Sequence, residues 1–162
     1  MAFRPDLVDV WIHRIVDTAP EVLLLRRAPG RSLAGLWQGV SGSLEPDERV
    51  TAGALRELVE ETGFGPSAIE AFYDLDLVNQ FHWAPADAIV SAAVFAVRVR
   101  PGIEPILSHE HDAARWVALE IARAEVIWPG YRIALGSIGA SILDVDRARW
   151  FELDLDGRRR LD

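Results

Sequence analysis

Apolar and polar residues alternate in several short stretches of the chain, which predicts that strands outnumber helices. Residues 7–16 alternate in this way and are rich in β-branched side chains, as expected of a half-buried strand. Further strands are predicted at residues 21–27, 36–44, 69–78 and 88–99, the strand at 36–44 being interrupted by its glycines. Residues 28–35 and the aromatic stretch 79–87 are expected to form loops.

A longer period of apolar residues predicts helices at residues 48–62, 119–125 and 128–144. Pro129 is well placed to open the last of these. Its apolar stripe consists of Tyr131, Leu135, Ile138 and Ile142. Because the helices interrupt the strands and do not alternate with them, we expect an α+β fold, an α/β/α sandwich on a mixed sheet.

The chain end mixes both signs of charge with a few large apolar residues. We expect residues 1–144 to form the domain and residues 145–162 to form a tail that docks in part through Trp150, Leu153 and Leu155. The Trp150-Phe151 pair leaves an alternative open, in which the tail is the arm of a homodimer.

Composition narrows the class of protein. The 162 residues, half of them apolar, suit a single domain with a proper core. A formal net charge of −8 argues against binding to a nucleic-acid polymer, and the absence of cysteine excludes a thiolate nucleophile. No signal-peptide pattern or membrane-length apolar run is present, so we expect a cytoplasmic protein that does not enter a membrane.

The predicted helix at 48–62 carries an unusual concentration of negative charge. At helical spacing its apolar residues share one face, and the opposite face carries Glu57, Glu60 and Glu61. Glu57 and Glu61 are one turn apart and repel each other, and the helix dipole disfavours acids in the last turn. Such a face is usually just solvated, but here a bound cation would offset the repulsion.

The residues around these glutamates favour the cation. The segment 42–64 reads G-x5-E-x7-R-E-L-x-E-E-x-G-F without a gap and closely resembles the Nudix box. The resemblance implies a Nudix-type sandwich and a Mg²⁺-dependent hydrolase, Mn²⁺ being an alternative ion. Such enzymes cleave a nucleoside diphosphate linked to another moiety, so the expected partner is a small nucleotide-like molecule.

The resemblance also implies roles for individual residues. Glu57 and Glu61 would bind the metal, and Glu60 would be a further ligand or the general base; which glutamate is the base stays open. Arg56 would orient a neighbouring carboxylate, and Ser41 would offer its carbonyl oxygen to the metal. Gly42 would let the backbone approach closely, whereas Glu48 and the helix-ending Gly63 would be structural.

Two further motifs narrow the substrate. The stretch "LWQGVSG", with Trp37 and Gln38, resembles the entry to the box in dihydroneopterin triphosphate pyrophosphohydrolases. Those relatives also carry a Glu-His pair before a late strand, which implies that Glu110 is an extra metal ligand. His109 and His111 could bind phosphate or merely flank this residue, and flanking is the favoured interpretation.

Other residues are candidates for substrate binding. Trp37, or Phe81 and Trp83 of the aromatic stretch, could stack on a flat heterocycle, and Arg27 or its neighbour could bind phosphate. The predicted substrate is a nucleoside triphosphate-like molecule, dihydroneopterin triphosphate or a dNTP. Diadenosine polyphosphates, nucleotide sugars and a ligand-sensing module without catalysis are the alternatives.

Overall fold

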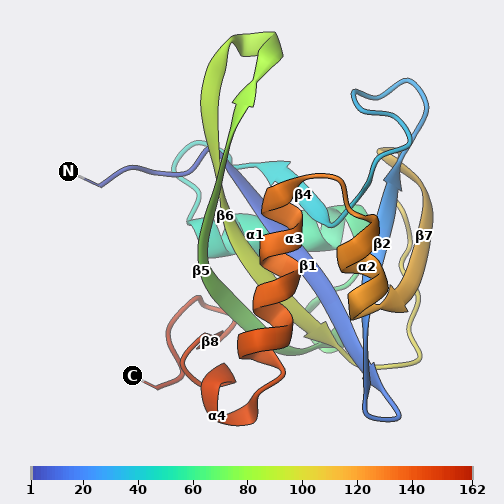
Figure 1. Cartoon of the computed structure of the whole chain (residues 1–162). Coiled ribbons are helices and arrows are strands. Elements are labelled where there is room, and N and C mark those ends of the chain that lie inside the picture. Colours follow the sequence, from blue (N-terminus) through green and yellow to red (C-terminus); the bar gives the residue numbers. More distant parts are fainter. Residues whose placement is uncertain (1, 162) are drawn as a thin grey trace.

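The computed structural model describes residues 2–161 and builds them around one mixed sheet (Figure 1). The strands are β1 (Leu7–Val16), β2 (Ala19–Arg27), β3 (Trp37–Gln38), β4 (Val40–Ser43), β5 (Ile69–Trp83), β6 (Ala88–Val99), β7 (His111–Ala118) and β8 (Glu152–Leu153). The α-helices are α1 (Val50–Thr62), α2 (Leu119–Glu125), α3 (Pro129–Ser137) and α4 (Val145–Ala148). Short 3₁₀ turns at Pro66–Ala68 and Ala84–Ala86 and a π-helical turn, η3, at Ile138–Ile142 complete the chain.

The sheet forks at β1. The first residues of β1 pair with β4, whereas its last residues pair with β2, and β3 pairs with the far end of β2. The chain crosses from one branch to the other at Gly39, where a Cβ atom would lie 2.9 Å from the carbonyl oxygen of Val10. β1 and β6 are parallel and the other pairs are antiparallel, so the sheet is mixed as predicted.

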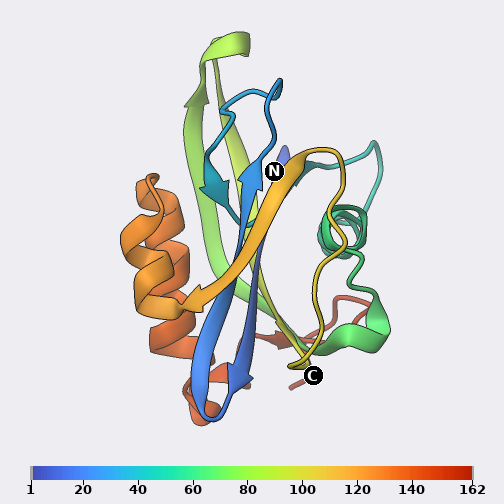
Figure 2. The same cartoon turned by 90° about the vertical axis from the view of Figure 1, so that its right-hand side faces the viewer.

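Helices cover both faces of this sheet (Figure 2). Alternation along β1 sends Val8, Val10 and Ile12 into the core under α1, while Trp11 points into the core under α2 and α3. Trp11 packs edge-on against Tyr131 of α3, with ring centroids 5.1 Å apart. The apolar stripe predicted after Pro129 is buried along its whole length, and the predicted α/β/α sandwich is confirmed.

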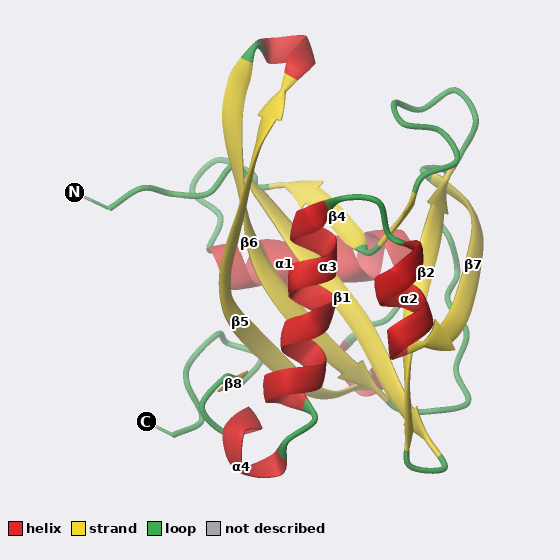
Figure 3. Ribbon diagram, viewed as in Figure 1, coloured by secondary structure: helices red, strands yellow, loops and turns green. Residues whose placement is uncertain are grey.

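The aromatic stretch 79–87 was expected to be a loop, and this expectation is wrong. β5 continues to Trp83, and only residues 84–87 turn the chain into β6. Phe81 and Trp83 are therefore paired with β6, in a hairpin that projects beyond the rest of the sheet (Figure 3). Asn79 to Trp83 alternate between half-buried and exposed positions, a strand pattern that the dense aromatic and polar residues hide.

The chain end returns to the domain. Leu153 is 5% exposed and pairs with Phe72 of β5, and Arg159 forms an ion pair with Asp74 at 3.1 Å. Trp150 and Leu155, which were also expected to dock, remain exposed. Docking therefore rests on the short strand β8 and its ion pairs. No helix among residues 2–161 is long and apolar enough to cross a membrane.

Candidate active site

The glutamates of α1 differ in their environment. Glu61 is 2% exposed and Glu57 is 8% exposed, whereas the side chain of Glu60 is 55% exposed. Helical periodicity had placed all of them on the solvent face and Val59 on the core face, but Val59 is exposed. The helix is rotated so that Glu57 and Glu61 lie against the sheet, which makes them expensive to ionise unless another charge compensates them.

Gly42 of β4 makes this position possible. A Cβ atom at residue 42 would lie 2.0 Å from the carboxyl carbon of Glu57. Real atoms do not approach so closely, so with any other residue at position 42 the Glu57 carboxylate would have to move. At the other end of the helix Gly63 adopts the left-handed conformation, with φ of 73°, and its N–H bonds to Val59, as predicted.

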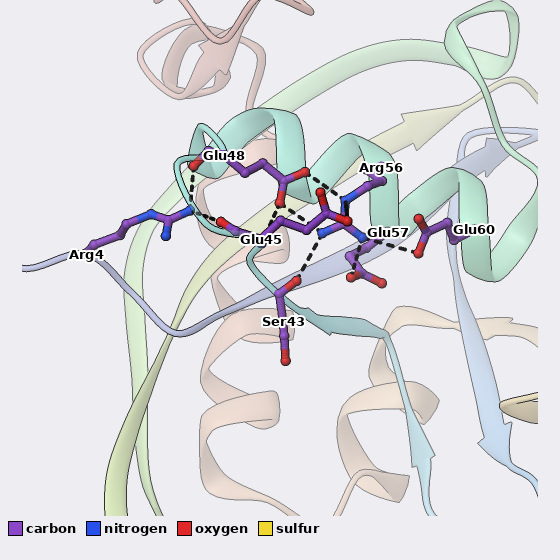
Figure 4. A network of polar contacts seen from close by, with 7 residues as sticks. All are labelled: Arg4, Ser43, Glu45, Glu48, Arg56, Glu57 and Glu60. Carbon is purple, nitrogen blue, oxygen red and sulfur yellow. Dashed lines mark hydrogen bonds and ion pairs between the residues drawn. The ribbon is translucent and has the colours of Figure 1, made fainter.

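Arg56 binds three glutamates at once (Figure 4). Its guanidinium donates to Glu48 at 2.7 and 2.9 Å, to Glu57 at 2.7 Å and to Glu60 at 3.2 Å. A further bond reaches the carbonyl oxygen of Ser43. This fork ties the start of α1 to its acidic face and holds the Glu57 carboxylate in place, as expected of an orienting arginine.

Glu110 reaches the same region from a different part of the chain. It lies just before β7, and its carbonyl oxygen accepts a hydrogen bond from the backbone of Ala28 at 2.8 Å. A pocket of about 310 Å³ is lined by Glu57, Glu60, Glu61, Ser108, His109 and Glu110. The structure therefore brings together the four glutamates predicted as metal ligands.

Electrostatics in the pocket reflect this crowding. Burial, with the nearby charges of Glu110 and Glu57, raises the pKa of Glu61 to about 9. Burial also raises the pKa of Glu57, although Arg56 opposes the shift. In contrast, hydrogen bonds from Arg56 lower the pKa of Glu48 to about 2, which fits the structural role expected for Glu48.

Comparison with models of known protein families identifies the family of this chain. Residues 6–135 match the model of the NUDIX domain, which is most of the chain. The chain belongs to the Nudix family.

One curated protein is also similar to this chain in sequence. The chain is 36% identical over 132 residues to a Myxococcus xanthus protein named octanoyltransferase; the match covers 79% of this chain but only 35% of that protein. This chain thus spans about a third of the length of that curated relative.

Solved structures with the Nudix fold are also similar. The dihydroneopterin triphosphate pyrophosphohydrolase of E. coli is 25% identical with a TM-score of 0.68, covering 82% of this chain and 92% of that one. An Ap4A hydrolase of C. elegans is 21% identical with a TM-score of 0.70, covering 85% and 96%. A Nudix hydrolase of Listeria monocytogenes has a TM-score of 0.71 at 24% identity, covering 85% and 93%. The family match and these likenesses confirm the prediction of a Nudix domain with a Nudix-type fold.

Nudix hydrolases generally use divalent metal ions, and the residues of this Nudix domain fit such an ion. Carboxylate oxygens are the ligands that Mg²⁺ and Mn²⁺ prefer, and both buried oxygens of Glu61 have no hydrogen-bond partner. Among residues 2–161, however, no three acidic or histidine side chains already stand together at metal-binding distance. Binding of an ion here would therefore require these side chains to move closer together.

The residues predicted to bind substrate stand outside the glutamate pocket. Arg27 bonds to the backbone oxygen and the hydroxyl of Ser32. Trp37 is half-buried, with the guanidinium of Arg115 4.3 Å from its ring centroid, so one ring face is already covered. Phe81 and Trp83 lie on the projecting hairpin, and neither they nor Arg27 line the 310 Å³ pocket.

Gln38 is 3% exposed, so its side chain does not face solvent. Its amide nitrogen is 3.1 Å from Nε2 of His111, which is itself buried. His111 was interpreted as a flanking residue, but its Nδ1 lies 3.8 Å from Oε2 of Glu61. Nothing in the sequence separates a buried histidine at the start of a strand from an exposed one, since the partners are 50 and 73 positions away.

Sequence reasoning also missed Asp9. It lies on β1 opposite Ser41 of β4 and is 5% exposed. Burial raises its pKa to about 6, although hydrogen bonds from the side chains of Ser41 and Asn79 oppose the shift. A single acidic residue in an otherwise apolar strand is the signal that could have identified it as a buried polar contact.

Proposed function

We propose that this Nudix domain hydrolyses a phosphoanhydride bond in a nucleoside triphosphate-like substrate, dihydroneopterin triphosphate or a dNTP, and releases pyrophosphate or phosphate. The observation that supports this most directly is the pocket in which the glutamates of α1 meet Glu110 from the β7 side of the fold. Carboxylates from separate segments around one pocket suit a cation bound together with a phosphate chain.

In this proposal Glu57, Glu61 and Glu110 hold Mg²⁺ or Mn²⁺, with the carbonyl oxygen of Ser41 as a further ligand. When bound, the ion polarises a phosphoryl oxygen and offsets the charge that develops in the transition state. Arg56 keeps the Glu57 carboxylate directed by a 2.7 Å hydrogen bond.

Glu60 is the candidate for the general base. It is exposed at the mouth of the pocket and only loosely held by Arg56, at 3.2 Å, so it can accept a proton from water and release it to solvent. A buried carboxyl such as Glu61 would exchange protons with solvent less readily.

The triphosphate-like substrate is supported by sequence and by likeness. The "WQGVSG" segment precedes the box as it does in the family of pyrophosphohydrolases that it resembles, and the E. coli dihydroneopterin triphosphate pyrophosphohydrolase is among the similar structures. Arg27 stands at the end of β2 beside this segment and is the candidate for phosphate binding.

A diadenosine polyphosphate or a nucleotide sugar is the second candidate substrate. The projecting hairpin offers Phe81 and Trp83, half-buried aromatic rings that could stack on a second heterocycle outside the glutamate pocket. The similarity to the C. elegans Ap4A hydrolase is at the level of the fold. We do not carry over the name octanoyltransferase, because only about a third of that protein is matched.

Product identification by phosphorus NMR in ¹⁸O-labelled water tests the proposal. The panel comprises dihydroneopterin triphosphate, dNTPs, diadenosine tetraphosphate and nucleotide sugars, each with Mg²⁺ or Mn²⁺. We expect hydrolysis of a triphosphate, loss of turnover by orders of magnitude in Glu57→Gln, and no loss in Glu120→Gln, which removes an exposed carboxylate on α2.

Preferential cleavage of the dinucleotide or sugar would support the second candidate instead. Binding without any product, even after prolonged incubation with metal, would contradict both and favour a ligand-sensing module.

A further inference from the structure

Three buried polar side chains form a row behind the glutamate pocket. Gln38 comes from β3, His111 from the start of β7 and Glu61 from the last turn of α1. Their exposed fractions are 3%, 4% and 2%. A buried polar row of this kind is costly unless its members interact, so the orientation of each group is restricted.

Hydrogen-bond chemistry assigns the proton on the central ring. The amide nitrogen of Gln38 can only donate, so Nε2 of His111, 3.1 Å away, must accept. On the other side, Nδ1 is the ring atom nearest to Glu61. When Glu61 is ionised, its carboxylate can only accept a hydrogen bond, so both neighbours then favour the tautomer with its proton on Nδ1. When Glu61 is protonated, Gln38 alone sets this tautomer.

The contact between His111 and Glu61 is not a hydrogen bond in this structure. The distance of 3.8 Å between Nδ1 and Oε2 is too long for a hydrogen bond, and neither Nδ1 nor the two Glu61 oxygens have another partner. Apart from the backbone of Ser41, which opposes the rise in the pKa of Glu61, these buried groups have only each other or a cation to interact with. A small rotation of either side chain would close the gap.

We propose that Gln38 fixes the Nδ1–H tautomer of His111, which in turn positions the Glu61 carboxylate for its role at the pocket. His111 is then a positioning residue and not a flanking one, and Gln38 acts through it. The link to metal binding rests on the proposed function, whereas the tautomer does not. Groups that orient a metal ligand in this way typically contribute 10–100-fold to metal affinity.

Long-range ¹H–¹⁵N NMR of the histidine-labelled, metal-free protein tests the first step. We expect protonated Nδ1 and unprotonated Nε2 for His111. In Gln38→Glu the new carboxylate can only accept, so Nε2 should become protonated. A wild-type ring protonated on Nε2, or a spectrum unchanged in Gln38→Glu, would overturn the proposal.

Calorimetric titration with Mn²⁺ tests the second step. His111→Asn keeps an N–H donor near the position of Nδ1, whereas His111→Leu removes it. We expect the leucine variant to bind Mn²⁺ about tenfold more weakly and the asparagine variant to stay within about threefold of the wild type.

His13→Gln is the matched control, because His13 is 1% exposed and lies on β1, where its ring approaches Tyr73 and not the glutamates. It should leave Mn²⁺ affinity unchanged. Equal affinities in the leucine and asparagine variants would overturn the positioning role, even if the substrate panel confirms hydrolysis. A different outcome would contradict only the proposed activity: no substrate of the panel is hydrolysed, but His111 carries its proton on Nδ1 and only His111→Leu weakens Mn²⁺ binding.

Discussion

At the scale of single residues, Glu61 makes the metal-free fold less stable at alkaline pH. Its pKa of about 9 in the folded chain lies well above its ordinary value of 4.5, so the folded state holds the proton more firmly than the unfolded state. The resulting stabilisation is complete below pH 4.5 and is lost as the pH rises toward 9.

We predict that the free energy of unfolding of the metal-free protein decreases by about 2 kcal/mol between pH 7 and pH 9. Urea unfolding in the presence of EDTA measures it. In Glu61→Gln this decrease should be much smaller, because the amide does not ionise. The same variant should lose turnover by orders of magnitude.

Two other buried groups with shifted pKa values, His13 and Asp9, change their charge outside this pH window. Burial lowers the pKa of His13 to about 3, so its contribution is present above pH 6.5 and lost in acid. The contribution of Asp9, whose pKa is raised to about 6, is lost as the pH rises through 6, so it is already largely absent at pH 7. Equal slopes in the wild type and Glu61→Gln would show that Glu61 is ionised in the folded, metal-free chain.

At the scale of elements, the approach of β4 to α1 determines whether the site can form. We predict that Gly42→Ala disrupts this approach, since the added Cβ would overlap the Glu57 carboxyl group. The expected result is a loss of Mn²⁺ affinity and turnover of tenfold or more, measured by calorimetry and the phosphate assay.

Gly65→Ala is the matched control for this change. Nothing lies within 4 Å of a Cβ atom at residue 65, and its φ of −90° is accessible to alanine. This variant should retain metal affinity. Wild-type behaviour of Gly42→Ala would mean that Glu57 moves away without functional consequence.

Sequence patterns predicted most elements because local chemistry determines them. Pro129 opens α3, Gly63 ends α1 and alternation marks β1, each through contacts within a few residues. The sequence pattern failed to predict features that depend on contacts between residues far apart in the chain. The strand character of Phe81 depends on pairing with Val90, and the burial of Glu61 depends on how α1 rotates against β4.

In the candidate site, too, residues close in sequence could be predicted and residues far apart could not. Spacing within the box identified the glutamates of α1, because they lie on one helix. The row from Gln38 to His111 joins residues 73 positions apart, and only the folded chain brings them together.

At the scale of the whole molecule, Leu153 is the residue of the C-terminal segment that lies in the core. Because Leu153 is 5% exposed, we predict that Leu153→Ala lowers the free energy of unfolding by about 2–4 kcal/mol, measured by urea denaturation. Leu155→Ala, at a 43% exposed position, should cost less than about 1 kcal/mol and is the control.

The alternative is that the tail forms the arm of a homodimer and does not dock within one chain. Light scattering of the chain ending at Asp144 would distinguish the two, since an arm predicts a fall in assembly and docking within one chain predicts only a loss of stability. Equal stability of Leu153→Ala and the wild type would contradict docking.

Hydrolysis and recognition of the rest of the substrate, as proposed, use different parts of the sheet. Hydrolysis, as proposed, depends on α1, β4 and the residues before β7. The candidates for recognising the rest of the substrate lie at the two ends of the β2–β3 connection and on the β5–β6 hairpin. Neither of these two regions takes part in the pairing of β4 with β1. We therefore expect that exchanging the β2–β3 connection or the β5–β6 hairpin changes substrate selectivity while α1 keeps its position against β4.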